Sequence, residues 1–145
     1  MIDSTWTTDL TPDVAEFLSE FERRGRPTEH DDGALFHTSF IAADPNQAST
    51  VTRDLFVQSL PVRRTMFAKA RVGVAHLVRA AQLDLDARYV LVRSEWDAER
   101  EGSEPIRLES TFLVMRGDDG LTVLAYLNHR DIAAILAELA ARSAR

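Results

Sequence analysis

The sequence contains no cysteine, a single lysine and no long apolar run. The absence of cysteine excludes disulfides, thiolate catalysis and thiolate metal sites, and it is typical of a reducing compartment. No stretch approaches the roughly 20 apolar residues that a membrane-spanning helix needs. The first residues, MIDSTWTTDL, lack the basic and apolar regions of an export signal. We therefore expect a cytoplasmic protein that does not associate with a membrane.

The sequence also has fewer basic than acidic residues: it contains 17 Lys and Arg and 23 Asp and Glu, which gives a net charge of −6. Nucleic-acid binding needs a clustered basic surface that neutralises phosphates, so this balance argues against nucleic acid as a partner. Lys69 is the single lysine beside many arginines and alanines, a bias typical of GC-rich bacterial genomes. We expect a bacterial source for that reason.

Motifs for cofactors and metals are missing as well. The chain has no glycine-rich phosphate loop and no G-x-S-x-G elbow. Its four histidines include no pair at the i, i+4 spacing of a helical zinc site: His30, His37, His76 and His129. We expect neither a cofactor nor a dedicated metal site.

What is present fits one domain, residues 1–145, because a chain of this length with 45% apolar residues can bury a core of its own. Its clearest helix is TPDVAEFLSEFERRG, with Thr11 as the N-cap and Gly25 at the end. Apolar residues recur in it at i, i+3, i+4 and i+7 and form one buried stripe: Val14, Phe17, Leu18 and Phe21. A polar loop follows over 26–33.

The middle of the chain predicts a short strand and then an interrupted helix. The strand is ALFHTSFIA, residues 34–42, in which aromatic and β-branched residues alternate loosely with polar ones. The helical region extends over 49–71, and Pro61 should break or kink it near Ser59 and Leu60. Its basic residues are interpreted as a solvated helix face: Arg53, Arg63, Arg64, Lys69 and Arg71.

After Gly73 the pattern predicts a four-stranded antiparallel meander. Its strands are joined by short connections, of which GDDG is a strong hairpin signal: 74–83, 87–99, 105–116 and 121–130. A C-terminal helix, DIAAILAELAARSAR, follows with Asp131 as its cap. Its apolar stripe comprises Ile132, Ile135, Leu136 and Leu139.

The turns predict which residues of neighbouring strands face each other. If Arg116 pairs with Leu121 across GDDG, then Val114 faces Val123, Phe112 faces Ala125 and Leu108 faces His129. In the preceding hairpin, two opposite-charge pairs would each contribute roughly 0.2–1 kcal/mol: Glu95 with Arg107, and Arg93 with Glu109. This choice assigns every side chain of the meander to a face.

The inner face then carries Val90, Val92, Ser94, Trp96, Ile106, Leu108, Ser110 and Phe112. The outer face carries the four charged residues and also apolar ones: Tyr89, Leu91, Leu113, Met115, Leu124 and Tyr126. A solvated sheet face is normally more polar, and an apolar patch of this size usually marks a contact surface. We expect a homodimer formed through the outer sheet face. The alternative is that the C-terminal helix covers this face.

This order of elements resembles the NTF2-like, or SnoaL-like, superfamily. Two stretches carry the resemblance: LDLDARYVLVRSEW followed by LESTFLVMRGDDGLTVLAYLNHRD, and VTRDLFVQSLPVRRTMFAKARVG. The resemblance implies an α+β cone, in which a strongly curved antiparallel sheet packs on N-terminal helices, with an extra C-terminal helix here. Members of the superfamily include isomerases, dehydratases, cyclases, hydrolases, transport factors and association domains, so the fold alone assigns no function.

Asp44-Pro45 resembles the strand-end Asp-Pro of the ketosteroid isomerase-type members, in which the aspartate moves a proton beside an apolar cavity. A carboxylate at a dry rim has a raised pKa that suits acid–base catalysis. The oxyanion donors of those enzymes are missing here, because the first helix offers Phe17 and Phe21 and no tyrosine. We therefore do not expect steroid isomerase activity. The alternative is that Asp44 only forms a turn at the end of a strand.

His129 is the second acid–base candidate, since the predicted register places it inside, near Ser94 and Leu108. The same register places Arg79 beside Ser94, so that four polar groups line an otherwise apolar wall: Arg79, Ser94, Ser110 and His129. In the alternative interpretation, His129 is structural and Arg79 reaches solvent. The other predicted ligand-binding residues are Phe17, Phe21, His37, Trp96, Leu108 and Phe112.

We expect the chain to bind a small hydrophobic molecule in an apolar pocket. Two alternatives stay open at this point. The protein is a non-catalytic dimeric association domain, or it is a cofactor-independent isomerase, dehydratase or hydrolase that uses Asp44 or His129.

Overall fold

The computed structural model describes residues 5–27 and 29–143. This part of the chain is α+β, with three helices and six strands, in the order α1 (Pro12–Arg24), β1 (Phe36–Ala43), β2 (Ala48–Thr52), α2 (Arg53–Lys69), β3 (Val72–Asp84), β4 (Tyr89–Arg100), β5 (Ile106–Gly117), β6 (Gly120–Asn128) and α3 (Ile132–Ser143). Among these helices none is both long and apolar enough to cross a membrane. Thr28 of the predicted loop and the last two residues of the predicted C-terminal helix lie outside the described residues.

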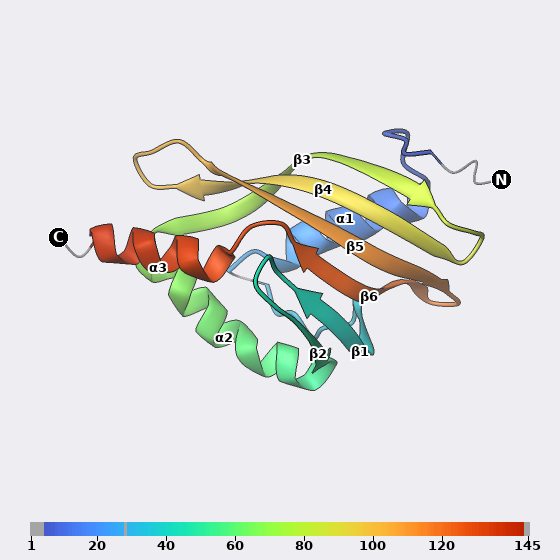
Figure 1. Cartoon of the computed structure of the whole chain (residues 1–145), viewed down its shortest axis with the longest axis horizontal. Helices are drawn as coiled ribbons and strands as arrows, with labels where there is room; N and C mark the ends of the chain where they lie inside the picture. The colour runs from blue at the N-terminus through green and yellow to red at the C-terminus, as the bar shows by residue number, and fades with distance from the viewer. Residues whose placement is uncertain (1–4, 28, 144–145) are drawn as a thin grey trace.

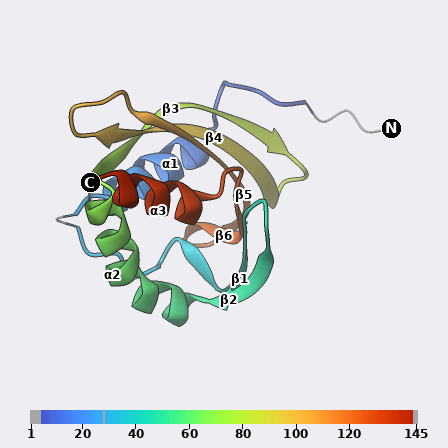
Figure 2. The same cartoon turned by 60° about the vertical axis from the view of Figure 1, so that its left-hand side comes forward.

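The six strands form one sheet in the order β2-β1-β6-β5-β4-β3. All neighbours are antiparallel except β1 and β6, which are parallel. The sheet is open and strongly curved: it curls around α1, and α2 and α3 lie along the open side of the curve (Figures 1 and 2). The expected cone is confirmed.

Helix α1 forms where its apolar stripe predicts it, and Val14, Phe17 and Leu18 are buried. Its first turn differs from the expected cap. The hydroxyl of Thr11 donates to the Asp13 carboxylate, and this carboxylate accepts the N–H of Val14 at 2.8 Å. The buried side chain of Gln82 in β3 accepts the N–H of Thr11 at 2.8 Å. The start of α1 is therefore fastened directly to the sheet.

The middle of the chain corrects two predictions. Ala48–Thr52 is an additional strand, β2, and α2 begins only at Arg53. Helix α2 continues through Pro61 to Lys69 without the predicted break. Pro61 is exposed, so its ring meets no packed neighbour, and the hydroxyl of Thr65 donates to its carbonyl at 3.0 Å. Phe56 and Phe67, on the two sides of Pro61, pack against buried core residues, and such tertiary contacts oppose the roughly 3 kcal/mol that a proline costs in a helix.

The predicted β5–β6 hairpin is correct at its turn and wrong beyond it. Arg116 pairs with Leu121 and Val114 with Val123, as expected. A β-bulge at Leu124 then shifts the register by one residue, so that Phe112 faces Tyr126 and not Ala125. A shift by one residue exchanges the two faces of a strand. Tyr126 is consequently buried inside, and the residues after it change sides as well.

The predicted β4–β5 register differs by two residues. Glu95 pairs with Glu109 and Trp96 with Leu108. Because the shift is even, every side chain keeps its predicted face. Val90, Val92, Ser94, Trp96, Ser110 and Phe112 are buried, as expected for the inner face.

The charged residues of the outer face pair diagonally, except for Asp97 and Arg107, which lie directly opposite each other. The Arg107 guanidinium lies 3.1 Å from Glu95 and 2.7 Å from Asp97, and Arg93 lies 3.2 Å from Glu109. Both predicted opposite-charge pairs, Glu95 with Arg107 and Arg93 with Glu109, therefore form, although as diagonal neighbours and not directly opposite each other.

Two groups of buried residues form the core. The larger one lies between α1 and the inner face of the sheet, and the smaller one joins α3 to Ala70, Val72 and Ala98. The N–H of Ala134 donates to Asp131 at 3.0 Å, which confirms the predicted cap of α3. Helix α3 packs against α2 and the ends of the strands (Figure 2), so the alternative in which α3 covers the outer face is wrong.

Candidate functional site

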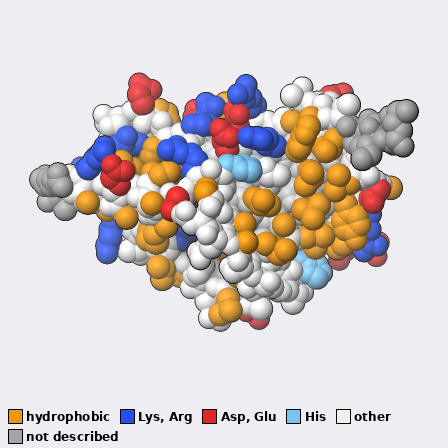
Figure 3. Space-filling view, viewed as in Figure 1, with side chains coloured by type: hydrophobic (Ala, Val, Ile, Leu, Met, Phe, Trp, Pro, Cys, Tyr) orange, Lys and Arg blue, Asp and Glu red, His pale blue; other side chains and the backbone are white. Residues whose placement is uncertain are grey.

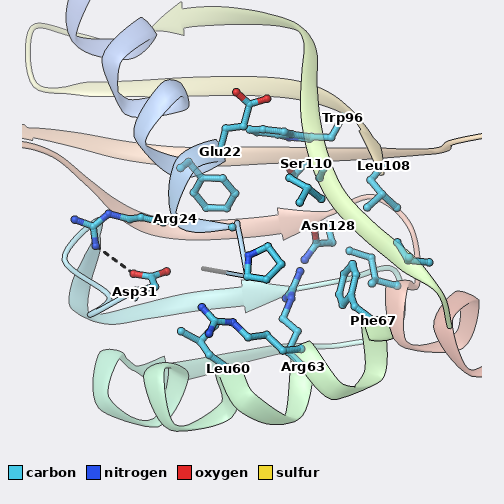
Figure 4. Close-up of a pocket in the computed structure, with 18 of the residues that line it drawn as sticks. Glu22, Arg24, Asp31, Leu60, Arg63, Phe67, Trp96, Leu108, Ser110 and Asn128 are labelled. Carbon is cyan, nitrogen blue, oxygen red and sulfur yellow. Dashed lines mark hydrogen bonds and ion pairs between the residues drawn. The ribbon is translucent and has the colours of Figure 1, made fainter. Parts of the chain in front are cut away.

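A cavity of about 450 Å³ lies between the end of α1, helix α2 and the inner face of the sheet (Figure 4). Helix α3 closes one side of it through Ile132. Most of its wall is apolar or aromatic, and the largest contributors are Phe21, Phe36, Phe56, Phe67, Trp96 and Tyr126. An enclosure of this size with few polar groups is the usual form of a small-molecule site.

The sequence creates this cavity because α2 contacts the core only through partly buried side chains such as Phe56 and Phe67, and a space remains between the helix and the sheet. Phe56, Leu60 and Phe67 lie on one face of α2 and all line the cavity. Within α2, whose residues are all described, no side chain is fully buried. The opposite wall is formed by rings in mutual contact: Phe21 lies 5.6 Å from Trp96, measured between ring centroids.

Two serines hold the indole of Trp96 in the wall. The Trp96 Nε1–H donates to the hydroxyl of Ser94 at 2.8 Å, and this hydroxyl lies 3.0 Å from that of Ser110. Ser94 is fully buried behind the wall, whereas Ser110 also lines the cavity. Because a buried N–H without an acceptor is costly, this chain of hydrogen bonds fixes the orientation of the ring.

Arg63 and Asn128 supply the polar groups at the centre of the cavity. Arg63 extends from α2 towards Asn128 of β6 (Figure 4), and both residues line the cavity. They also line a second hollow of about 330 Å³ next to the first. The guanidinium of Arg63 lies over the ring of Phe67, 5.5 Å from its centroid.

The other charged residues of the wall are held by partners. Arg24 pairs with Glu20, Asp31 and Asp32 at 2.7–3.2 Å. Burial lowers the pKa of Arg24, but these carboxylates outweigh it and raise the pKa. Hydrogen bonds from Arg23 and Arg24 lower the pKa of Glu20 to about 2. These groups are therefore fixed in their charged forms.

Four of the predicted ligand-binding residues line the cavity: Phe21, Trp96, Leu108 and Ser110. Three others, Phe17, Ser94 and Phe112, lie in the packed core behind its wall. The inner-face assignment therefore places five of these residues on the correct side of the sheet, and the other two, Phe17 and Phe21, belong to the buried stripe of α1.

Asp44 lies in the turn between β1 and β2, away from the cavity. Its carboxylate accepts the N–H of Asn46 at 2.8 Å and that of Gln47 at 3.1 Å, and its own N–H donates to the Gln47 carbonyl. This is the turn-forming alternative. His37 is exposed on β1, with Nδ1 at 3.2 Å from the Ser39 carbonyl.

His129 and Arg79 point away from the cavity, so their predicted inner placement is wrong. The bulge at Leu124 turns His129 outwards, where its Nε2 lies 2.6 Å from the hydroxyl of Thr111. Arg79 pairs with Glu95 on the outer face and its side chain is 72% exposed. The predicted cluster of four polar residues thus reduces to Ser94 and Ser110.

Sequence reasoning missed Arg63, Tyr126 and Asn128. Tyr126 and Asn128 depend on the bulge, for which the sequence carries no glycine or proline signal. Arg63 carried a usable signal, because it continues the series Phe56, Leu60, Phe67 at helical spacing. An arginine on the apolar side of a helix indicates a buried contact and not a solvated face.

Within residues 5–27 and 29–143, no three carboxylate or imidazole groups come together in a way that could hold a metal ion.

Solved structures share this fold at low sequence identity. An NTF2-like protein of unknown function from Shewanella oneidensis superposes with a TM-score of 0.67 at 14% identity, covering 81% of this chain and 96% of its own. An NTF2-like protein of unknown function from Pseudomonas putida superposes with a TM-score of 0.66 at 11% identity, and the match covers 86% of this chain and 89% of that protein. A Catenulispora acidiphila protein in complex with S-DNPA superposes with a TM-score of 0.62 at 13% identity, and the match covers 85% of this chain and 94% of that protein.

No protein-family model matches the sequence. No curated protein matches it either. The structural likeness shows the fold: the chain has the NTF2-like α+β fold, as the resemblance of its sequence implied.

Proposed function

We propose that the protein binds a small, mostly apolar molecule in the cavity between α1, α2 and the sheet. The observation that carries this proposal is the cavity itself, about 450 Å³ with walls of aromatic and aliphatic side chains. Ligand sites typically occupy about 300–1,000 Å³ and combine apolar walls with a few polar groups. Ser110, Asn128 and Arg63 provide such groups here.

The structural relatives support a binding role without naming the ligand. The Catenulispora acidiphila protein has the same fold and was solved in complex with S-DNPA. Because folds are reused for many tasks, this likeness supports the class of function only.

We propose binding and assign no reaction, because the two predicted acid–base residues lie elsewhere. Asp44 forms a turn, and His129 faces the opposite side of the sheet. Two carboxylates do line the cavity, but both are engaged. Glu22 accepts the N–H of Leu77 at 2.6 Å, and Asp31 accepts that of Gly33 at 2.8 Å.

Tryptophan fluorescence tests the proposal, since Trp96 forms part of the wall. Trp6 is 47% exposed and would obscure the signal, so the measurement uses a Trp6→Phe background. Titration with primary alcohols and phenylalkanamides of increasing length should give a saturable change that peaks at one ligand size. Ala75→Phe, which places a ring into the cavity, should abolish the change, and His129→Ala should leave it intact. A flat response across the whole series would contradict the proposal.

We also propose that the chain forms a homodimer through the outer sheet face. Five half-buried apolar residues gather there: Tyr89, Leu91, Leu113, Met115 and Leu124. An apolar patch is visible over β4, β5 and β6 in the space-filling view (Figure 3), and α3 leaves it uncovered. Contiguous apolar patches on a surface favour association.

Sedimentation velocity tests this assembly. Leu91→Glu should convert a dimer to a monomer, because it places a charge in the centre of the patch. Leu55→Glu is the matched control, since Leu55 is 59% exposed on α2, away from the patch. A wild-type chain that sediments as a monomer even at high protein concentration would refute the dimer.

A further inference from the structure

We propose that the ligand is an apolar carboxylic acid whose carboxylate binds Arg63, with its hydrocarbon body among the aromatic rings of the cavity. This inference rests on the proposed function and specifies the chemical class of the ligand. The observation behind it is that Arg63, unlike every other charged residue in the wall, has no ion-pair or hydrogen-bond partner among the described residues.

Arg63 carries a charge that the protein leaves unpaired inside an apolar cavity. Among residues 5–27 and 29–143, no carboxylate forms an ion pair with it, and its guanidinium lies instead over the ring of Phe67. Its position in the series Phe56, Leu60, Phe67 directs it towards the cavity (Figure 4). A half-buried cation without an anion is unfavourable, so an anionic ligand would form the ion pair that the protein itself does not provide.

The neighbouring arginines show the contrast. Arg24 lies against three carboxylates. Arg64, one residue from Arg63, is exposed and donates to the carbonyl of Glu29 at 2.8 Å. Both also border the cavity, but each already donates to a protein acceptor, whereas Arg63 forms no hydrogen bond with a described residue. Arg63 is therefore the cavity arginine whose donors are all available to a ligand.

Asn128 provides a second donor beside Arg63. Its side-chain amide is half-buried, forms no hydrogen bond with another described residue, and faces the same space as Arg63. Both residues also line the adjoining hollow, so they stand where the two spaces meet. A guanidinium and an amide directed at one point can donate several hydrogen bonds to one planar anion.

The chemistry of the wall favours a carboxylate over a larger anion. The planar fork of an arginine matches a carboxylate with two parallel hydrogen bonds. Glu22 and Asp31 also border the cavity, and they would repel a doubly charged group such as a phosphate. The aromatic walls require that the remainder of the molecule be apolar.

Phenylalkanoic acids and the corresponding amides, from phenylacetic to phenylhexanoic, form the matched probes, because each pair differs only in the charged group. Their affinities are measured through Trp96 fluorescence in the Trp6→Phe background. In this protein the acid of the best-fitting length should bind about tenfold more tightly than its amide, or more. Arg63→Met should remove this preference while the amide still binds, which also shows that the cavity is intact. Arg63→Lys should restore part of the preference.

Lys69→Met is the matched control, since it removes the same charge from an exposed position of the same helix that does not line the cavity, and it should keep the preference for the acid. Equal affinities for acid and amide in the Trp6→Phe protein would overturn the carboxylate inference and leave the binding proposal intact. A preference that survives Arg63→Met, or that Lys69→Met abolishes, would also overturn it. If neither acids nor amides bind at any length, the binding proposal itself is refuted.

Discussion

The two faces of the β4–β5 hairpin are built from alternate residues of the same two strands, yet they satisfy their polar groups in opposite ways. On the inner face, Trp96 and Ser110 bond to Ser94, whose hydroxyl is fully buried. On the outer face, Arg107 and Glu95 pair in contact with solvent. Water can replace a lost hydrogen-bond partner on the outer face and cannot do so on the inner face. The same kind of substitution should therefore lower the free energy of unfolding more on the inner face.

The largest difference between the faces is expected from removing an aromatic ring. Phe112 is fully buried, and its ring centroid lies 5.3 Å from that of Phe17 and 4.9 Å from that of Tyr126. Phe112→Ala should lower the free energy of unfolding by about 3–5 kcal/mol, because it removes these contacts and leaves a hole. Leu113→Ala, on the outer face of the same strand, should cost clearly less. Urea denaturation measures both, and similar losses would show that the outer patch is as tightly packed as the core.

The next difference concerns single hydroxyl groups. Ser94→Ala leaves the N–H of Trp96 buried without its acceptor and should lower the free energy of unfolding by about 1–3 kcal/mol. Thr111→Ala removes a hydroxyl that contacts His129 at the exposed surface, and it should change stability by no more than about 0.5 kcal/mol. Chemical denaturation and the red shift of Trp96 emission report on both variants. An unchanged Trp96 spectrum in Ser94→Ala would contradict the role assigned to the serine.

An intermediate effect is expected at the rim, where Arg116 of β5 binds Asp13 of α1 at 2.7 Å. Burial raises the pKa of Asp13, but hydrogen bonds from Arg116 and Thr11 outweigh it, so the pKa is lowered. The contribution of Asp13 to stability is therefore present above about pH 4, its unfolded value, and is lost as the pH falls further. Arg116→Met should lower stability at neutral pH and reduce its decline between about pH 5 and pH 2. An acid dependence identical to that of the wild type would exclude this pair as a contributor.

The smallest effect is expected on the outer ladder. Arg107→Met breaks the pairs with Glu95 and Asp97, which are solvent-accessible, so the loss should stay below about 1 kcal/mol and should shrink as salt is added. Denaturation at low and high ionic strength measures it. A larger loss that salt does not reduce would indicate that this face is buried, as it would be in a dimer.

The elements with strong local patterns could be predicted from the sequence. The stripe of α1, the GDDG turn and the cap at Asp131 each determine structure within a few residues. Strand β2 could not be predicted, because Ala48–Thr52 is short and runs directly into α2. Its pairing with β1 is a tertiary contact that no local pattern encodes.

The accuracy of the site prediction depended on whether a register error was even or odd. The error of two residues in β4–β5 left Trp96 and Ser110 on the correct side. The bulge of one residue in β6 placed Tyr126 inside and His129 outside, against the prediction. Arg63 was missed for another reason, since the local excess of basic residues concealed its position on the apolar side of α2.

Helix α2 is held by its termini, by α3 and by rings that border a space. Its backbone amides should therefore exchange with solvent hydrogen more readily than those of α1, whose apolar stripe is buried in the larger group of core residues. A molecule bound in the cavity would contact the rings of α2 and slow that exchange. Slower hydrogen exchange in α2 would then show that the cavity is occupied, even for ligands that leave tryptophan emission unchanged.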